Sequence, residues 1–115
     1  MLFLEYPPCS TCKKARAWLQ EQQVEFEARH IKEEKPSYEE LKLWWEKSGL
    51  PLKKFFNTSG LLYKSMGLKD QLPGMDPDAQ LRLLASDGML VKRPLLIGAD
   101  FVLVGFKEDQ WKEIL

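Results

Sequence analysis

The sequence predicts an α/β fold with a mixed four-stranded sheet and an all-helical insertion. Three observations lead to this expectation. Roughly the first 30 residues show a strand–helix–strand pattern. Residues 37–87 show only helical patterns, and residues 95–115 read as two strands and a helix. The length of 115 residues supports one modest hydrophobic core, so we expect residues 1–115 to form one domain.

The chain begins with a short strand followed by a helix. Residues 2–4 are apolar and precede Pro7 and Pro8, which predicts a buried strand that ends before the prolines. A helix is expected from there to about residue 22, because apolar residues recur at helical spacing and basic residues occupy the other face. Its apolar residues are Cys12, Ala15, Trp18 and Leu19.

A second strand is expected over residues 24–29, where apolar and charged residues alternate. Val24, Phe26 and Ala28 would form its buried face. A strand, a helix and a strand within about 30 residues make a βαβ unit, whose crossover should be right-handed.

The middle segment, residues 37–87, is expected to be the helical insertion. Ser37 and Glu40 have the spacing of a capping box, in which each side chain accepts from the other residue's amide. Asp76 and Pro77 are typical of the start of a later helix, with an N-cap followed by proline at the first helical position.

The C-terminal part returns to strands. Two apolar runs, residues 95–97 and 101–104, flank a turn at Gly98 and predict an antiparallel hairpin. A final helix is expected over residues 107–115. Its inward-facing residues would be Trp111, Ile114 and Leu115. The order βαβ, helical insertion and ββα is that of a thioredoxin-like fold.

Charge and hydropathy exclude several classes of protein. Seventeen basic residues balance seventeen acidic ones, which argues against a broad surface for nucleic acid or anionic membranes. No apolar run approaches the roughly 20 residues that span a bilayer, and the start lacks the basic segment of a signal peptide. We therefore expect a monomer in the reducing cytoplasm, with no membrane and no direct nucleic-acid partner.

Cys9 and Cys12 are the only cysteines, and they are three positions apart at the junction of the first strand and helix. Unpaired amides and the helix dipole at such a junction lower the pKa of a thiol, and Lys13 and Lys14 add positive charge. Cys9 is therefore the expected nucleophile. Cys12 lies one turn further on the same face and can resolve a mixed disulfide at Cys9.

Two alternatives to a redox pair are a zinc half-site and an inert pair. Tetrahedral zinc needs four ligands, but the chain offers no second cysteine pair and a single histidine, His30. His30 follows the second strand and is interpreted as a surface or strand-end residue. In the reducing cytoplasm, a close cysteine pair at a strand-to-helix turn favours redox chemistry.

Arg93 and Pro94 form a second candidate feature at the start of the third strand. In a thioredoxin-like fold the proline would be cis and would lie beside the cysteine turn, with the arginine facing the same pocket. The alternative is a strand-start proline preceded by a solvated arginine, and residue pattern leaves both open. The four tryptophans fall on apolar helix faces, which favours core packing over ligand stacking.

The sequence resembles the ArsC/Spx family of arsenate-reductase-like, thioredoxin-fold proteins over essentially its whole length. Four segments carry most of the resemblance. They are Tyr6-Pro7-Pro8-Cys9-Ser10-Thr11-Cys12-Lys13-Lys14-Ala15, then Phe56-Asn57-Thr58-Ser59-Gly60 with the later Gly67-Leu68-Lys69-Asp70, and finally Lys92-Arg93-Pro94-Leu95-Leu96-Ile97. The Asn57-Thr58-Ser59-Gly60 stretch looks closer to an uncharacterised branch of small ArsC-like proteins.

The resemblance implies roles for particular residues. Cys9 would be the nucleophile, Pro94 the cis proline, and Arg93 a cation that stabilises the thiolate or a bound oxyanion. The residues expected to contact substrate are Ser10, Thr11, Asn57 and Pro94. No cofactor is implied, and electrons would come from thioredoxin or glutathione.

The chain departs from glutathione-dependent arsenate reductases at two positions. Those enzymes use three arginines around the cysteine, whereas only Arg93 matches here, with Asn57 and Gly105 at the other two positions. Losing two guanidinium groups removes bidentate contacts to an oxyanion. The leading expectation is therefore a thiol–disulfide oxidoreductase. The alternatives are an Spx-like redox sensor that binds the RNA polymerase α-subunit, and an arsenate reductase.

Overall fold

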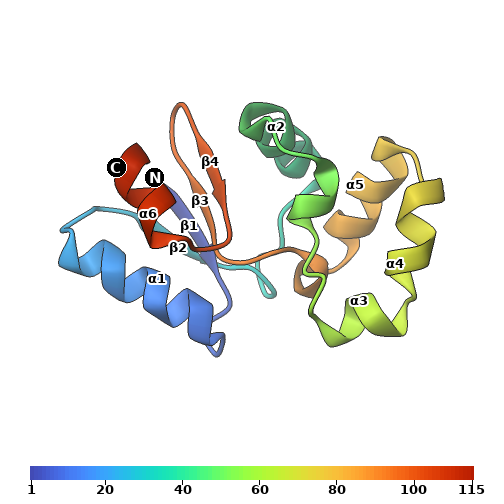
Figure 1. Cartoon of the computed structure of the whole chain (residues 1–115), viewed down its shortest axis with the longest axis horizontal. Coiled ribbons are helices and arrows are strands. Elements are labelled where there is room, and N and C mark those ends of the chain that lie inside the picture. Colours follow the sequence, from blue (N-terminus) through green and yellow to red (C-terminus); the bar gives the residue numbers. More distant parts are fainter.

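A mixed four-stranded sheet joins the N- and C-terminal parts of the chain in the computed structural model, which describes all of residues 1–115 (Figure 1). The strands are β1 (Leu2–Glu5), β2 (Glu27–His30), β3 (Leu95–Ile97) and β4 (Val102–Val104), in the order β2-β1-β3-β4. β1 pairs parallel with β2, and β3 pairs antiparallel with β1 and β4. The predicted α/β class and thioredoxin-like order are confirmed.

Six α-helices accompany the sheet, and three short 3-10 helices lie between β2 and β3. The α-helices are α1 (Ser10–Glu21), α2 (Tyr38–Ser48), α3 (Leu61–Ser65), α4 (Leu68–Gln71), α5 (Pro77–Ser86) and α6 (Glu108–Ile114). The 3-10 helices are η1 (Leu52–Phe55), η2 (Leu72–Gly74) and η3 (Gly88–Leu90). None of the helices combines the length and the apolar character that crossing a membrane requires.

Alternate residues of each strand pack on opposite faces of the sheet, because successive side chains in a strand point to opposite sides. Phe3 packs with residues of α1 and α6, including Trp18 and the fully buried Trp111. Leu4 instead belongs to the cluster that contains the buried residues of the helical segment. Figure 1 accordingly shows α1 and α6 on one side of the sheet and α2–α5 on the other.

The predicted start signals of the helical segment are present. The Ser37 Oγ accepts from the Glu40 amide at 3.1 Å, and the Ser37 amide donates to Glu40 Oε1 at 3.0 Å. Asp76 accepts from the Ala79 amide at 2.8 Å and is followed by Pro77 at the first turn of α5. These contacts satisfy amides that the helices themselves leave unpaired.

The second strand starts later than predicted, and one of its residues faces solvent. The chain leaves α1 through Gln23 in the left-handed region (φ 56°), and Val24 still donates to the Leu19 carbonyl. Pairing with β1 therefore begins only at Glu27. Ala28, predicted to be buried, is exposed because β2 is an edge strand that contributes no residue to the α1–α6 cluster.

The last helix buries less than predicted. Trp111 is fully buried, but Ile114 is 47% exposed and Leu115 is 43% exposed. The helix α6 has only seven residues, and its tryptophan alone fills the space against the sheet. The strand β4 also begins one residue later than predicted, because the Phe101 carbonyl accepts from the Gly98 amide and closes the turn.

Candidate active site

Cys9 is the N-cap of α1, immediately after the turn that follows β1. Its backbone is extended, its amide donates to the Tyr6 carbonyl at 2.9 Å, and its carbonyl accepts from Lys13 at 3.0 Å. The turn formed by Pro7 and Pro8 therefore delivers the thiol to the positive end of the helix dipole.

The surroundings of Cys9 favour its thiolate. Burial by itself would raise the pKa of the Cys9 thiol. This effect is outweighed by hydrogen bonds from the Cys12 amide, the Cys12 thiol and the Thr11 amide, and by attraction to Arg93. The pKa of Cys9 consequently lies below its ordinary value, as a nucleophilic cysteine requires.

Cys12 has the opposite character. Its side chain is fully buried, and its sulfur accepts from the Tyr6 amide at 3.5 Å. Burial, together with the hydrogen bond and the charge of the neighbouring Cys9, raises the pKa of Cys12 to about 12. Cys12 is thus a protonated thiol held one helical turn behind a Cys9 thiol whose pKa is lowered.

Arg93 is held by contacts on three sides. Its Nη1 donates to the Met89 carbonyl at 3.2 Å, and its guanidinium lies 5.1 Å from the centre of the Tyr6 ring. With its amide oxygen facing the guanidinium, Asn57 accepts from Nη1 at 3.2 Å and from Nη2 at 3.3 Å. These contacts fix a cation that lowers the pKa of Cys9.

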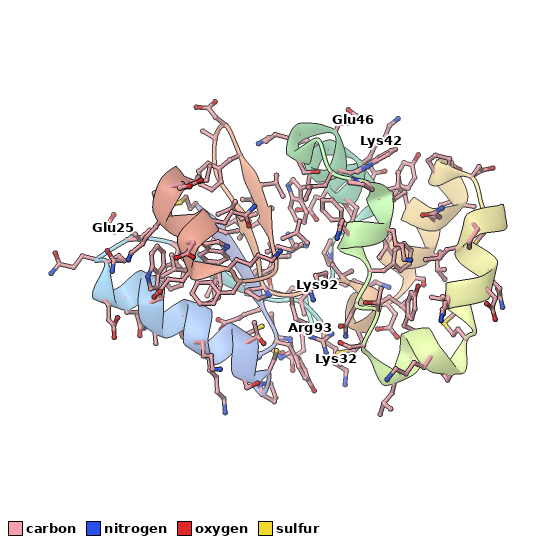
Figure 2. The ribbon with its side chains drawn as sticks, viewed as in Figure 1. Glu25, Lys32, Lys42, Glu46, Lys92 and Arg93 are labelled. Atoms are coloured by element: carbon pink, nitrogen blue, oxygen red, sulfur yellow. The ribbon has the colours of Figure 1, made fainter.

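A cavity of about 740 Å³ opens in front of the Cys9 thiol, between the sheet and the helical segment. Figure 2 shows Lys92, Arg93 and Lys32 lying in this region between the two parts of the molecule, and all three line the cavity. The start of α3 supplies the exposed Leu61 to the same wall.

The structure brings some of the predicted site residues together and leaves others apart. Cys9, Thr11, Asn57 and Arg93 all line the cavity. Cys12 lies behind Cys9 and does not line the cavity, and neither does Ser10, which is the exposed first residue of α1.

The Arg93–Pro94 peptide bond is cis, as the thioredoxin-like alternative required. Pro94 is buried, and its carbonyl accepts from the Gly105 amide at 2.8 Å. Its side chain is not among those that line the cavity.

Sequence reasoning missed the part that Tyr6 plays. This residue contacts both functional centres, through its amide to the Cys12 sulfur and through its ring to Arg93. Its position directly before the Pro7–Pro8 turn was the available signal. Lys32 and Lys107, which also line the cavity, carried no signal because they lie far from Cys9 in sequence.

His30 closes a turn after β2. Its Nδ1 accepts from the amides of Lys32 at 3.3 Å and Glu33 at 3.2 Å, and its ring packs edge-on against Tyr6 at 5.8 Å. No group of three histidine, cysteine or acidic side chains is arranged to hold a metal ion.

The ArsC family profile matches residues 4–114. The chain belongs to the ArsC family. The uncharacterized protein YusI of Bacillus subtilis is 57% identical over 113 residues, which cover 98% of this chain and 96% of YusI. The global transcriptional regulator Spx of Enterococcus faecalis is 33% identical over 110 residues, covering 95% of this chain and 81% of that protein.

Solved structures of ArsC relatives superimpose closely on this ArsC-family chain. An ArsC family related protein from Bacteroides fragilis gives a TM-score of 0.97 at 53% identity, covering 99% of this chain and 96% of its own. An arsenate reductase from Vibrio cholerae gives a TM-score of 0.87 at 27% identity, with coverage of 99% and 96%. The family expected from the sequence motifs is therefore confirmed.

Proposed function

We propose that this protein is a thiol–disulfide oxidoreductase in which Cys9 attacks and Cys12 resolves. The observation that carries this proposal is the contrast between the two thiols. Cys9 faces a cavity, and the pKa of its thiol is lowered. Cys12 is buried behind Cys9, and the pKa of its thiol is about 12. A reactive thiolate backed by a protonated thiol is the arrangement that two-step disulfide exchange needs.

The cycle has two exchange steps. The Cys9 thiolate attacks one sulfur of a substrate disulfide, a Cys9–substrate disulfide forms, and the other substrate sulfur leaves with the electron pair. Cys12 then loses its proton and attacks the Cys9 sulfur, which releases the second substrate thiolate. The substrate disulfide has gained two electrons, and the dithiol has become a Cys9–Cys12 disulfide. Thioredoxin or glutathione would reduce it again.

The pKa of Cys12 orders these steps. Part of its elevation comes from the hydrogen bond and the charge of Cys9. Both contributions disappear when Cys9 enters a mixed disulfide, so the pKa of Cys12 falls only after the first step. The Cys12 thiol is thereby activated only after the mixed disulfide at Cys9 has formed.

The test is a redox titration of the pair against glutathione, with free thiols alkylated and the products counted by mass spectrometry. The wild type should form a reversible intramolecular disulfide. The variant C12S should accumulate a mixed disulfide between Cys9 and glutathione. The matched variant C9S, which lacks the nucleophile, should form a mixed disulfide more slowly than C12S does. A wild type that forms no Cys9–Cys12 disulfide under oxidising conditions would contradict the mechanism.

Arsenate reduction is a second candidate, favoured by the likeness to the Vibrio cholerae arsenate reductase and by the fixed cation Arg93 beside Cys9. Both Asn57 and Gly105, at the positions of the two missing arginines, line the cavity. A coupled assay with arsenate and either thioredoxin or glutathione decides this question. Turnover that survives C9S would rule out this site.

A redox-sensing role is the third candidate, favoured by the 33% identity to Spx of Enterococcus faecalis. The Cys9–Cys12 disulfide would then act as a switch in the cytoplasm for binding the RNA polymerase α-subunit. A pull-down of the α-subunit in reducing and in oxidising buffer tests it. Absence of binding in both states would end this candidate.

A further inference from the structure

A second cavity adjoins the one in front of Cys9. It has a volume of about 550 Å³ and lies over η1 and the start of α6. The two cavities share Lys92, Val104 and Lys107 and so adjoin, and we call the two together the cationic groove. The groove starts at the Cys9 thiol and ends near Lys53 and Lys54.

The groove concentrates positive charge in a chain that has none overall. Seventeen basic and seventeen acidic residues balance in the whole sequence. The only acidic side chain that lines the two cavities is Asp87, whose carboxylate accepts from the Met89 amide at 2.9 Å. Glu108, Asp109 and Glu113 line a separate cavity beyond Lys107 and Gln110. The cations of the groove are Lys32, Lys53, Lys54, Lys92, Arg93 and Lys107. The remaining surface therefore carries an excess of negative charge, and the molecule has a strong charge asymmetry.

The backbone beneath the groove is tied together. The Lys92 amide donates to the Phe55 carbonyl at 2.8 Å, and Phe56 forms an isolated antiparallel bridge with Val91. These bonds hold η1, which carries Lys53 and Lys54, against the segment that leads to Arg93. The backbone that carries Lys53, Lys54, Lys92 and Arg93 is thus held together by the fold.

Apolar side chains line the groove beside the cations. Leu61, which is 86% exposed, and Leu62 border the Cys9 end, and Leu50 and Pro51 border the far end. A ligand that complements both cavities needs negative charge and apolar groups along its length. A small disulfide bound at Cys9 would leave the far cavity empty.

We infer that the cationic groove binds an acidic, partly apolar protein segment and presents its disulfide to Cys9. This inference rests on the proposed disulfide exchange, and it names the class of substrate. Cys9 bonds to one sulfur of the segment's disulfide, the partner sulfur leaves as a thiolate, and Cys12 releases the segment as a thiol. A cellular thiol or dithiol returns the two electrons.

The aromatic residues of the groove favour a protein segment over single-stranded nucleic acid. Stacking platforms for bases need exposed aromatic faces. Phe56 is only 1% exposed, and Phe106 packs edge-on against Trp111 with ring centres 4.9 Å apart. The groove offers mainly cations and aliphatic groups, since Phe56 is buried and Phe106 is half-buried against Trp111.

The experiment uses two synthetic peptides that share one cysteine and the same apolar residues. One carries three aspartates and the other three lysines, and each cysteine is activated as a mixed disulfide with the neutral leaving group 2-thiopyridine. The full-length C12S variant releases 2-thiopyridone as Cys9 forms its disulfide with the peptide. At low salt we expect the acidic peptide to react about tenfold faster or more, and about 0.5 M salt should remove the difference.

Charge variants locate the effect. The double variant K53Q/K54Q should lower the acidic-to-basic rate ratio severalfold. Because both rates come from the same variant, this ratio cancels any change in the intrinsic reactivity of Cys9. The matched double variant K42Q/K112Q makes the same charge change outside the groove and should keep the ratio. Equal rates for the two peptides, or a ratio unaffected by K53Q/K54Q, would overturn the inference.

Three outcomes separate the substrate class from the proposed function. A single-stranded oligonucleotide and a free acidic peptide are compared as inhibitors of the reaction between Cys9 and the activated acidic peptide. Inhibition by the oligonucleotide at the lower concentration would assign the groove to nucleic acid and overturn the inference. If C12S fails to react with dithiodipyridine itself, the proposed function fails. If it reacts with dithiodipyridine but shows no charge preference, only the substrate class is wrong.

Discussion

At the scale of single residues, the reactivity of Cys9 depends on groups that hold its negative charge in place. Burial opposes the thiolate, while two amides, the Cys12 thiol and Arg93 favour it. Arg93 can do this because its guanidinium is fixed by the Met89 carbonyl, the Tyr6 ring and the Asn57 amide. Asn57, expected to contact substrate, is only 8% exposed and also positions this cation.

Replacing Arg93 should make Cys9 less reactive at neutral pH. In R93Q the charge that favours the thiolate is lost, so the pKa of Cys9 rises. We expect the iodoacetamide alkylation rate at pH 7, measured in a C12S background, to fall about threefold, and the rate–pH profile to move to higher pH. The remote control R82Q should leave the rate–pH profile unchanged. If the rate–pH profile of R93Q is the same as that of its parent, Arg93 does not lower the pKa of Cys9.

Gly60, which lines the same cavity, offers a way to disturb the Arg93 support through Asn57. A Cβ at this position would lie 2.6 Å from the terminal amide of Asn57, which must then shift. We therefore expect both N57A and G60A to raise the pKa of Cys9. The effect of G60A should be smaller than that of R93Q. The alkylation profile measures this. The control G74A adds a Cβ that meets nothing within 4 Å and should behave as the wild type.

At the scale of elements, two ion pairs join neighbouring segments. Arg16 of α1 binds the buried Glu5 at the end of β1, which fixes the helix that carries both cysteines. Arg29 of β2 donates to both carboxylate oxygens of Glu40 at 2.7 and 2.9 Å, and also to the carbonyls of Glu34 and Lys35. The second pair links the sheet to the capping box of α2 and sets where the helical segment begins.

The Arg29–Glu40 pair should make stability depend on pH. The hydrogen bonds from Arg29 hold the pKa of Glu40 below its ordinary value. A depressed carboxyl pKa contributes stability above the unfolded-state pKa, and this contribution is lost as the pH falls through the folded-state pKa. The free energy of unfolding in urea should therefore drop more between pH 7 and pH 4 in the wild type than in E40Q.

The exposure of Glu40 limits the size of this effect, since its side chain is 36% exposed and solvent screens the pair. The matched variant E39Q, on the exposed side of the same first turn, should lose stability with falling pH as the wild type does. Parallel curves for wild type and E40Q would contradict the assigned role.

At the scale of the whole molecule, one thin sheet connects two hydrophobic clusters. Phe3, Leu96 and Leu103 point into the cluster of α1 and α6, while Leu4 and Leu95 of the same strands point into the cluster of the helical segment. Neither cluster can lose its packing without exposing strands that the other needs. The cavity with Cys9 lies between the two sides of this arrangement.

Unfolding should therefore be a single cooperative transition. Tryptophans lie in both clusters, so fluorescence reports on both, and its urea curve should coincide with that of far-UV circular dichroism. We expect W111A to cost about 4 kcal/mol and L84A about 3 kcal/mol, because each removes a fully buried side chain. Each variant should still unfold in one step. Separate transitions for the two probes would show that the clusters fold independently.

The sequence by itself determined the order of elements, because apolar spacing, capping residues and prolines are local signals. It also placed Cys9 at the junction of a strand and a helix. Residue pattern left the conformation of Pro94 open, and only the family resemblance implied the cis form that the structure has. Local signals erred where burial depends on neighbours. Ala28 alternates as a buried residue would, but it lies on an edge strand that no helix covers at that point.

Only the tertiary structure decided which charges meet. A net charge of zero concealed six cations that come from four separate parts of the chain and line one groove. The topology brings Lys32, η1 and Lys107 beside Arg93. Their positions in the sequence do not predict this proximity. Electrostatic attraction depends on separation in space, so the thiol could be found from the sequence, whereas the charged groove that leads to it could not.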